Sequence, residues 1–104
     1  MKNKANKTKL HPVRLDLEGI KAESVAIAGT FNDWKPTATP MVPAAPGHWT
    51  KEMALPPGKY EYLLVVDGQW QLDPKCPQQV PNPYGGMNCV LEIKPDHRAS
   101  ARAS

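Results

Sequence analysis

The sequence predicts an all-β fold, an antiparallel β-sandwich of about seven short strands. The chain has 12 prolines in 104 residues, and a proline inside a helix removes a hydrogen bond and clashes with the preceding turn. Short segments of alternating apolar and polar residues recur every ~8–12 residues, separated by turn residues. With 40% hydrophobic and 22% charged residues, the composition is that of one globular domain.

The first half of the chain supplies three expected strands. Residues 11–19 alternate apolar with charged side chains, as in a half-buried strand. Residues 23–29 place valine and isoleucine on one face and small alanines on the other. Residues 37–41 are interpreted as a short edge strand, in which Pro40 would be tolerated.

The second half supplies the remaining strands. Residues 48–55 alternate apolar with polar side chains, as in a strand, and residues 87–93 are expected to form the last strand. Residues 59–72 are the strongest segment, because they are rich in aromatic and β-branched residues and contain the dipeptide Asp-Gly, a hairpin signal. A long proline-rich loop is expected over residues 73–86.

The hairpin turn at Asp67-Gly68 determines which face Trp70 occupies. A two-residue turn places Val65 opposite Trp70, and side chains opposite each other in an antiparallel pair share a face. The outer face then carries Glu61, Leu63, Val65 and Trp70, and the inner face carries Tyr60, Tyr62, Leu64 and Val66. The two glutamines that flank the tryptophan would point inward, so a bulged turn that buries Trp70 instead stays open as an alternative.

An outward tryptophan presents a flat apolar face and marks a contact site for a protein, a nucleobase or a sugar ring. Sugar C–H groups pack on aromatic faces, while sugar hydroxyls need amide or charged partners. A nucleobase site normally has basic residues nearby to hold phosphates. Only Lys59 lies near Trp70, so nucleic acid is an unlikely partner.

The basic charge lies at the two ends of the chain. Residues 1–9 contain four lysines and no acidic residue, whereas residues 10–95 carry a net charge of −2. We interpret residues 1–9 and 96–104 as flexible tails on one folded domain, residues 10–95. No apolar run approaches the ~20 residues of a membrane span, and no signal peptide follows the first lysines. A cytoplasmic location is expected by default.

No catalytic, metal or cofactor site is expected. Cys76 and Cys89 should stay reduced in the cytoplasm, and their spacing does not fit a zinc site. His11, His48 and His97 have no plausible nucleophile to activate. The two aspartates in Asp-Gly and Asp-Pro turns, Asp67 and Asp73, are explained by turn chemistry rather than by a glycosidase carboxylate pair.

Three segments together resemble the family 48 carbohydrate-binding modules. They are VAIAGTFNDW, LPPGKYEYLLVVDGQWQLDP and NPYGGMNCVLEI, in the family's order and near its spacing, within residues 11–94. The family includes the glycogen-binding domain of the AMP-activated protein kinase β-subunit and the early-set domains of branching and debranching enzymes. The resemblance implies an immunoglobulin-like (early-set) sandwich and an exposed site for α-1,4-glucan chains of glycogen, starch or maltooligosaccharides.

The resemblance also implies roles for individual residues. Trp34 and Trp70 would stack on glucose rings, Asn88 would bond a sugar hydroxyl, and Tyr84 would reach over the sugar. Gly86 falls where the kinase domains have a threonine. Without the resemblance, Trp34 could equally cap the core, and Asn88 could satisfy turn backbone. Phe31 and Trp49 are interpreted as structural.

Leu63 departs from the family, whose binding members commonly carry a lysine at this position. A leucine cannot donate a hydrogen bond, and losing one charge-assisted bond weakens binding by about 1–3 kcal/mol. Two functions follow. The first is a non-catalytic α-glucan-binding module, with a kinase or glucan-active enzyme as the protein that contains it. The second, which Leu63 favours, is a structural or protein-interaction module that does not bind sugar.

Overall fold

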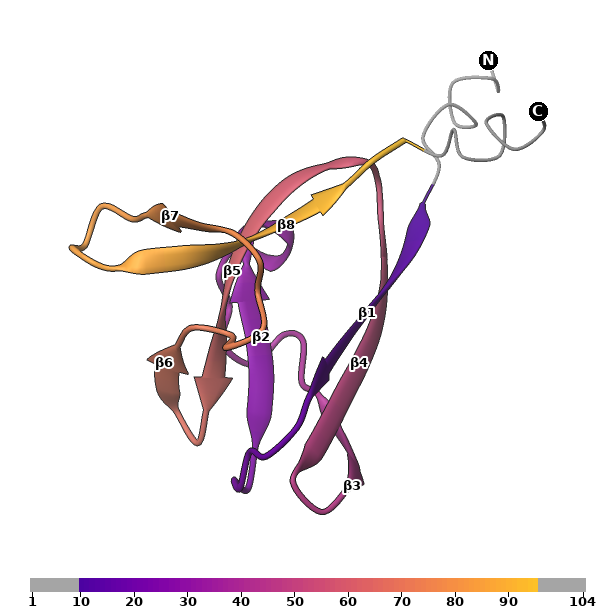
Figure 1. Cartoon of the computed structure of the whole chain (residues 1–104), viewed down its shortest axis with the longest axis vertical. Coiled ribbons are helices and arrows are strands. Elements are labelled where there is room, and N and C mark those ends of the chain that lie inside the picture. Colours follow the sequence, from indigo (N-terminus) through magenta and orange to yellow (C-terminus); the bar gives the residue numbers. More distant parts are fainter. Residues whose placement is uncertain (1–9, 96–104) are drawn as a thin grey trace.

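The computed structural model describes residues 10–95, which form two antiparallel sheets (Figure 1). The three-stranded sheet has the order β1 (His11–Leu17), β4 (His48–Leu55), β3 (Val42–Ala45). The five-stranded sheet has the order β2 (Val25–Gly29), β5 (Gly58–Val66), β8 (Met87–Ile93), β7 (Gln79–Pro81), and β6 (Gln69–Gln71) also pairs with β5. The tails expected at residues 1–9 and 96–104 lie outside the described residues. The prediction of an all-β, antiparallel sandwich is confirmed.

The two sheets share one hydrophobic core. The three-stranded sheet contributes Leu17 and Trp49, and the five-stranded sheet contributes Val25, Ile27, Tyr62, Leu64 and Cys89. Trp49 is buried, and its indole N–H donates to the carbonyl oxygen of Ile20 at 3.1 Å, which confirms its structural interpretation. Within residues 10–95, no helix has the length and apolarity needed to cross a membrane.

Two segments differ from their predicted secondary structure. Residues 37–41 do not form a strand: their pairing is limited to a bridge between Ala26 and Pro40, and the edge strand is β3 instead. The loop predicted over residues 73–86 contains β7, which pairs with the start of β8. Pro81 is tolerated at the end of β7 because this is an edge strand, where a missing N–H leaves no partner unsatisfied.

The predicted hairpin register is confirmed. Val65 pairs with Trp70 and Val66 with Gln69, so the bulged alternative is excluded. Tyr62 and Leu64 lie in the core, as expected for the inner face of β5. Gln69 and Gln71 are nonetheless exposed, because β6 pairs only with the last residues of β5, at the end of the sheet.

The expectation that Cys76 and Cys89 stay reduced is wrong for this structure, in which a disulfide joins them. Cys89 is fully buried on β8, and the chain beyond Asp73 turns back towards it, bringing the two Cα atoms to 5.9 Å. The Asp73 backbone N–H also donates to Cys89 Sγ at 3.3 Å. A sequence separation of 13 residues could not reveal this pairing, which depends on how the loop folds over β8.

Candidate functional site

A groove of about 650 Å³ lies on the outer face of the five-stranded sheet. Its walls come from the 3₁₀ segment η1 (Thr30–Asn32) and the turn after it, from β5 and β6, and from β8 and the loop that leads into it. The lining residues are Thr30, Trp34, Glu61, Leu63, Trp70, Asn82, Pro83, Tyr84 and Asn88. Five of the six residues expected at the site therefore meet in one groove.

Trp70 provides an open aromatic surface in the groove. It lies on β6 with 47% of its surface exposed, and its partner across the hairpin, Val65, is buried. An indole this exposed on a three-residue strand adds little to the core, so its flat face is available to a ligand.

Trp34 is both a packing residue and a groove residue. It contacts the small apolar cluster of Ala26, Ala28 and Val65 on the outer face of β2 and β5, and it is partly buried there. It also lines the groove. The structure thus shows that Trp34 packs on apolar residues, and its role as a ligand-facing residue stays a prediction.

The backbone that carries Trp34 is held in an uncommon conformation. Asp33 and Trp34 both have left-handed φ angles, 58° and 57°. Asn32 stabilises the turn, because its Oδ1 accepts from the Gly29 N–H at 3.0 Å and its Nδ2 donates to the Ile27 carbonyl at 3.0 Å. A Cβ at Gly29 would lie 2.8 Å from the Cβ of Tyr62, so only glycine lets β2 approach β5 here.

Tyr84 lines the groove from the loop that leads into β8. It is 92% exposed, and its backbone N–H donates to Asn82 Oδ1 at 2.9 Å. Gly86 does not line the groove; its N–H donates to the same Asn82 oxygen at 3.0 Å, so it supports the loop instead. Gly85, with φ of 90°, supplies the left-handed turn that returns the chain to β8.

Asn88 lies in the groove, but its side chain is only 5% exposed and is bonded to protein groups. Its Oδ1 accepts from Asn82 Nδ2 at 3.1 Å, and its Nδ2 donates to Glu61 Oε1 at 2.9 Å. Its partners are side chains, so the alternative of a residue that satisfies turn backbone is wrong.

Four groove-lining residues were not predicted as site residues: Thr30, Glu61, Asn82 and Pro83. The hairpin register could have identified Glu61, since it places this side chain on the outer face beside Leu63. Asn82 and Thr30 lie in connections whose course the strand pattern does not determine.

The two turn aspartates have structural partners. Asp67 Oδ1 accepts from the Glu23 and Ser24 backbone N–H groups at 2.8 and 2.9 Å. Asp73 is buried and accepts from the Tyr62 hydroxyl at 2.7 Å. Burial, together with this bond, raises the pKa of Tyr62 well above its ordinary value. No group of three or more His, Cys, Asp or Glu side chains within residues 10–95 could hold a metal ion.

A β-sandwich with an aromatic groove on the outer face of its five-stranded sheet is the arrangement expected of a carbohydrate-binding module. The chain belongs to the family described as the glycogen recognition site of AMP-activated protein kinase, whose model matches residues 11–99. The resemblance stated from the three sequence segments is thereby confirmed.

Individual relatives agree with this assignment. The chain is 41% identical over 56 residues to "Protein PTST homolog 2, chloroplastic" of Arabidopsis thaliana, which covers 54% of this chain and 10% of that protein. It is 31% identical over 74 residues to 5'-AMP-activated protein kinase subunit beta-1 of Sus scrofa, covering 69% of this chain and 56% of that protein. The human kinase subunit beta-2 is 33% identical over 72 residues, covering 69% of this chain and 25% of the subunit. The chain therefore spans between a tenth and little more than half of these relatives.

Proposed function

We propose that this chain is a non-catalytic module that binds α-1,4-glucan, such as glycogen, starch or maltooligosaccharides. The observation that best supports this proposal is that Trp34, Trp70 and the exposed Tyr84 line a single groove. Glucose rings would stack on Trp70 and on the groove side of Trp34, with Tyr84 closing over one side. Aromatic faces suit the apolar C–H surface of a pyranose ring, and the stacking adds to the gain from apolar burial.

The affinity for a single chain should be weak. Leu63 stands in the groove where family members that bind sugar commonly have a lysine, and no lysine, arginine or histidine is among the groove-lining residues. Stacking therefore supplies most of the binding energy, and a Kd on the order of 0.1 mM or weaker is expected. The apparent affinity for branched polymers would be higher, because a module that leaves one chain end can rebind to a neighbouring one.

The matched relatives suggest how such a module would be used. Two of them are kinase subunits by name, and the chain covers only part of each. We propose that this domain brings a kinase or a glucan-active enzyme to the polymer, and that the domain itself performs no chemistry.

A glycogen co-sedimentation assay tests the proposal. Trp70→Ala should lose at least tenfold in apparent affinity, because it removes a large, half-exposed indole from the groove. Trp34→Ala should also lose binding, and its melting temperature must be measured because Trp34 packs on Ala26, Ala28 and Val65. Leu10→Ala, at an exposed apolar residue just before β1 and outside the groove, is the matched control and should bind as wild type. Wild-type binding by folded Trp70→Ala would refute the stacking site.

Leu63 favours one alternative, a module that docks the same groove on a protein surface without binding sugar. Titration with maltoheptaose separates the two functions. A saturable change in tryptophan fluorescence at millimolar sugar supports glucan binding. The absence of any response at that concentration supports docking.

A further inference from the structure

One carboxylate, that of Glu61, is among the groove-lining side chains, and the structure assigns it a function. We propose that Glu61 is the specificity-determining residue of the site. One of its oxygens accepts a hydrogen bond from a sugar hydroxyl, and its charge favours uncharged glucan over glucan that carries phosphate. This inference rests on the proposed glucan binding and names the kind of glucan that the groove selects.

Three groove-lining side chains, Asn82, Asn88 and Glu61, form a hydrogen-bond chain that runs in one direction. The Tyr84 and Gly86 N–H groups donate to Asn82 Oδ1. Asn82 Nδ2 donates to Asn88 Oδ1, and Asn88 Nδ2 donates to Glu61 Oε1. In each of these bonds the acceptor lies one step nearer to Glu61 than the donor. The chain therefore ends on the Glu61 carboxylate, an acceptor that carries a negative charge.

The chain also determines which atoms remain for a ligand. The amide groups of Asn88 each have a protein partner already, and the residue is buried. Among the hydrogen bonds of residues 10–95, the Glu61 carboxylate accepts only the one from Asn88, at Oε1. Its other oxygen, Oε2, is left for a sugar hydroxyl. A carboxylate oxygen held in place by a neighbour accepts hydrogen bonds strongly, because the acceptor is charged and little further ordering is needed.

Charge then discriminates between ligands. Glu61 is the only ionised side chain among the groove-lining residues, so no cation in the lining compensates it. A phosphate monoester brings a charge of about −1.5 to −2. At a separation of roughly 8 Å in water-like dielectric, the repulsion amounts to about a fivefold loss of affinity for phosphate-bearing glucan.

The experiment compares maltoheptaose with maltoheptaose monophosphate, each titrated at low ionic strength and followed by tryptophan fluorescence. Wild type should bind the neutral sugar about fivefold more tightly. Glu61→Gln keeps a carbonyl oxygen for Asn88 but removes the charge. It should weaken binding of the neutral sugar by roughly three- to tenfold and bring the two affinities close to equal. Glu18→Gln, the same charge change at an exposed residue outside the groove, should leave both affinities at wild-type values.

The outcomes separate this inference from the function on which it rests. Wild-type binding to the neutral sugar, with an unchanged preference in folded Glu61→Gln, overturns the role of Glu61 and leaves glucan binding intact. Binding of neither sugar by wild type overturns both. A second measurement needs no variant: raising the salt from 10 mM to 0.5 M screens the charge, so the wild-type preference should shrink towards one. A preference that does not respond to salt contradicts the inference.

Discussion

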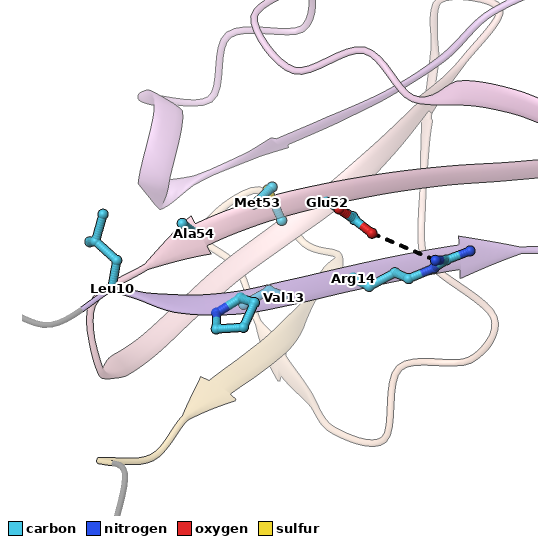
Figure 2. Close-up of a pocket in the computed structure, with 7 residues that line it drawn as sticks. Leu10, Val13, Arg14, Glu52, Met53 and Ala54 are labelled. Atoms are coloured by element: carbon cyan, nitrogen blue, oxygen red, sulfur yellow. Dashed lines mark ion pairs between the residues drawn. The ribbon is translucent and has the colours of Figure 1, made fainter.

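The two sheets each carry a hollow on the surface, and the two hollows differ in chemistry. The groove of the five-stranded sheet is lined by Trp34, Trp70 and Tyr84. The hollow of the three-stranded sheet, of about 500 Å³, lies over β1 and β4, and an ion pair between Arg14 and Glu52 crosses it (Figure 2). Its remaining lining residues are Leu10, Pro12, Val13, Met53 and Ala54. One hollow offers flat rings to a ligand, whereas the other offers small aliphatic groups and charges that already pair with each other.

The polar contacts behind each hollow differ as well. Behind the groove, the five-stranded sheet has the disulfide at Cys89 and the buried bond between Tyr62 and Asp73. The three-stranded sheet has one buried indole bond, from Trp49 to Ile20, and otherwise surface ion pairs such as Arg14 with Asp16 at 3.0 Å. Exposed pairs contribute little, because water and salt screen them. The comparison teaches that the sheet with exposed aromatics is also the one whose supporting residues are fixed, as a preorganised binding surface requires.

Of the changes that test this comparison, removing the disulfide should give the largest loss of stability. A closed loop of this size stabilises a domain by about 3 kcal/mol. Urea unfolding with and without reductant should differ by about that amount, and Cys76→Ser should match the reduced protein. The unfolded, unreduced protein should show no free thiol. Two titratable thiols under those conditions would contradict the structure.

Tyr62→Phe should have the next largest effect, a loss of about 1–3 kcal/mol at neutral pH, because the buried Asp73 loses its hydroxyl partner. The folded-state pKa of Tyr62 is raised above the ordinary 10.0. The contribution of the Tyr62 hydroxyl to the free energy of unfolding is therefore complete below pH 10. It declines as the pH rises further, because the tyrosine of the unfolded state loses its proton first. Urea unfolding of both proteins at pH 7 and above pH 10 should show the difference shrinking at alkaline pH. A difference that does not change with pH would assign the cost to packing alone.

Arg14→Ala should have the smallest effect, because its partners Asp16 and Glu52 are on the surface. The guanidinium beside Asp16, together with His48, holds the pKa of that carboxyl below its ordinary value. Any stability that this adds is present at neutral pH and is lost as the pH falls into the acidic range. The melting temperature at pH 7 and the affinity for glycogen should both match wild type. Reduced glycogen binding would show that the two sheets are coupled.

The sequence predicted the parts of the molecule that follow from local patterns. The Asp67-Gly68 turn determined the register, and the register placed Trp70 on the outer face. The location of the disulfide and of β7 was not predictable in this way, because both depend on how a proline-rich loop packs against β8. Asn82 was missed for the same reason. The cytoplasmic location stays a prediction.

The three tryptophans provide the most direct test of the central claim, because only two of them line the groove. Trp34 and Trp70 are groove residues, whereas Trp49 is buried with its indole N–H bonded to Ile20. Maltoheptaose should be titrated into ¹⁵N-labelled protein while the three indole N–H signals are followed. The account predicts saturable shifts for Trp34 and Trp70 with one common Kd, and no shift for Trp49. Unchanged Trp34 and Trp70 signals at millimolar sugar would contradict it.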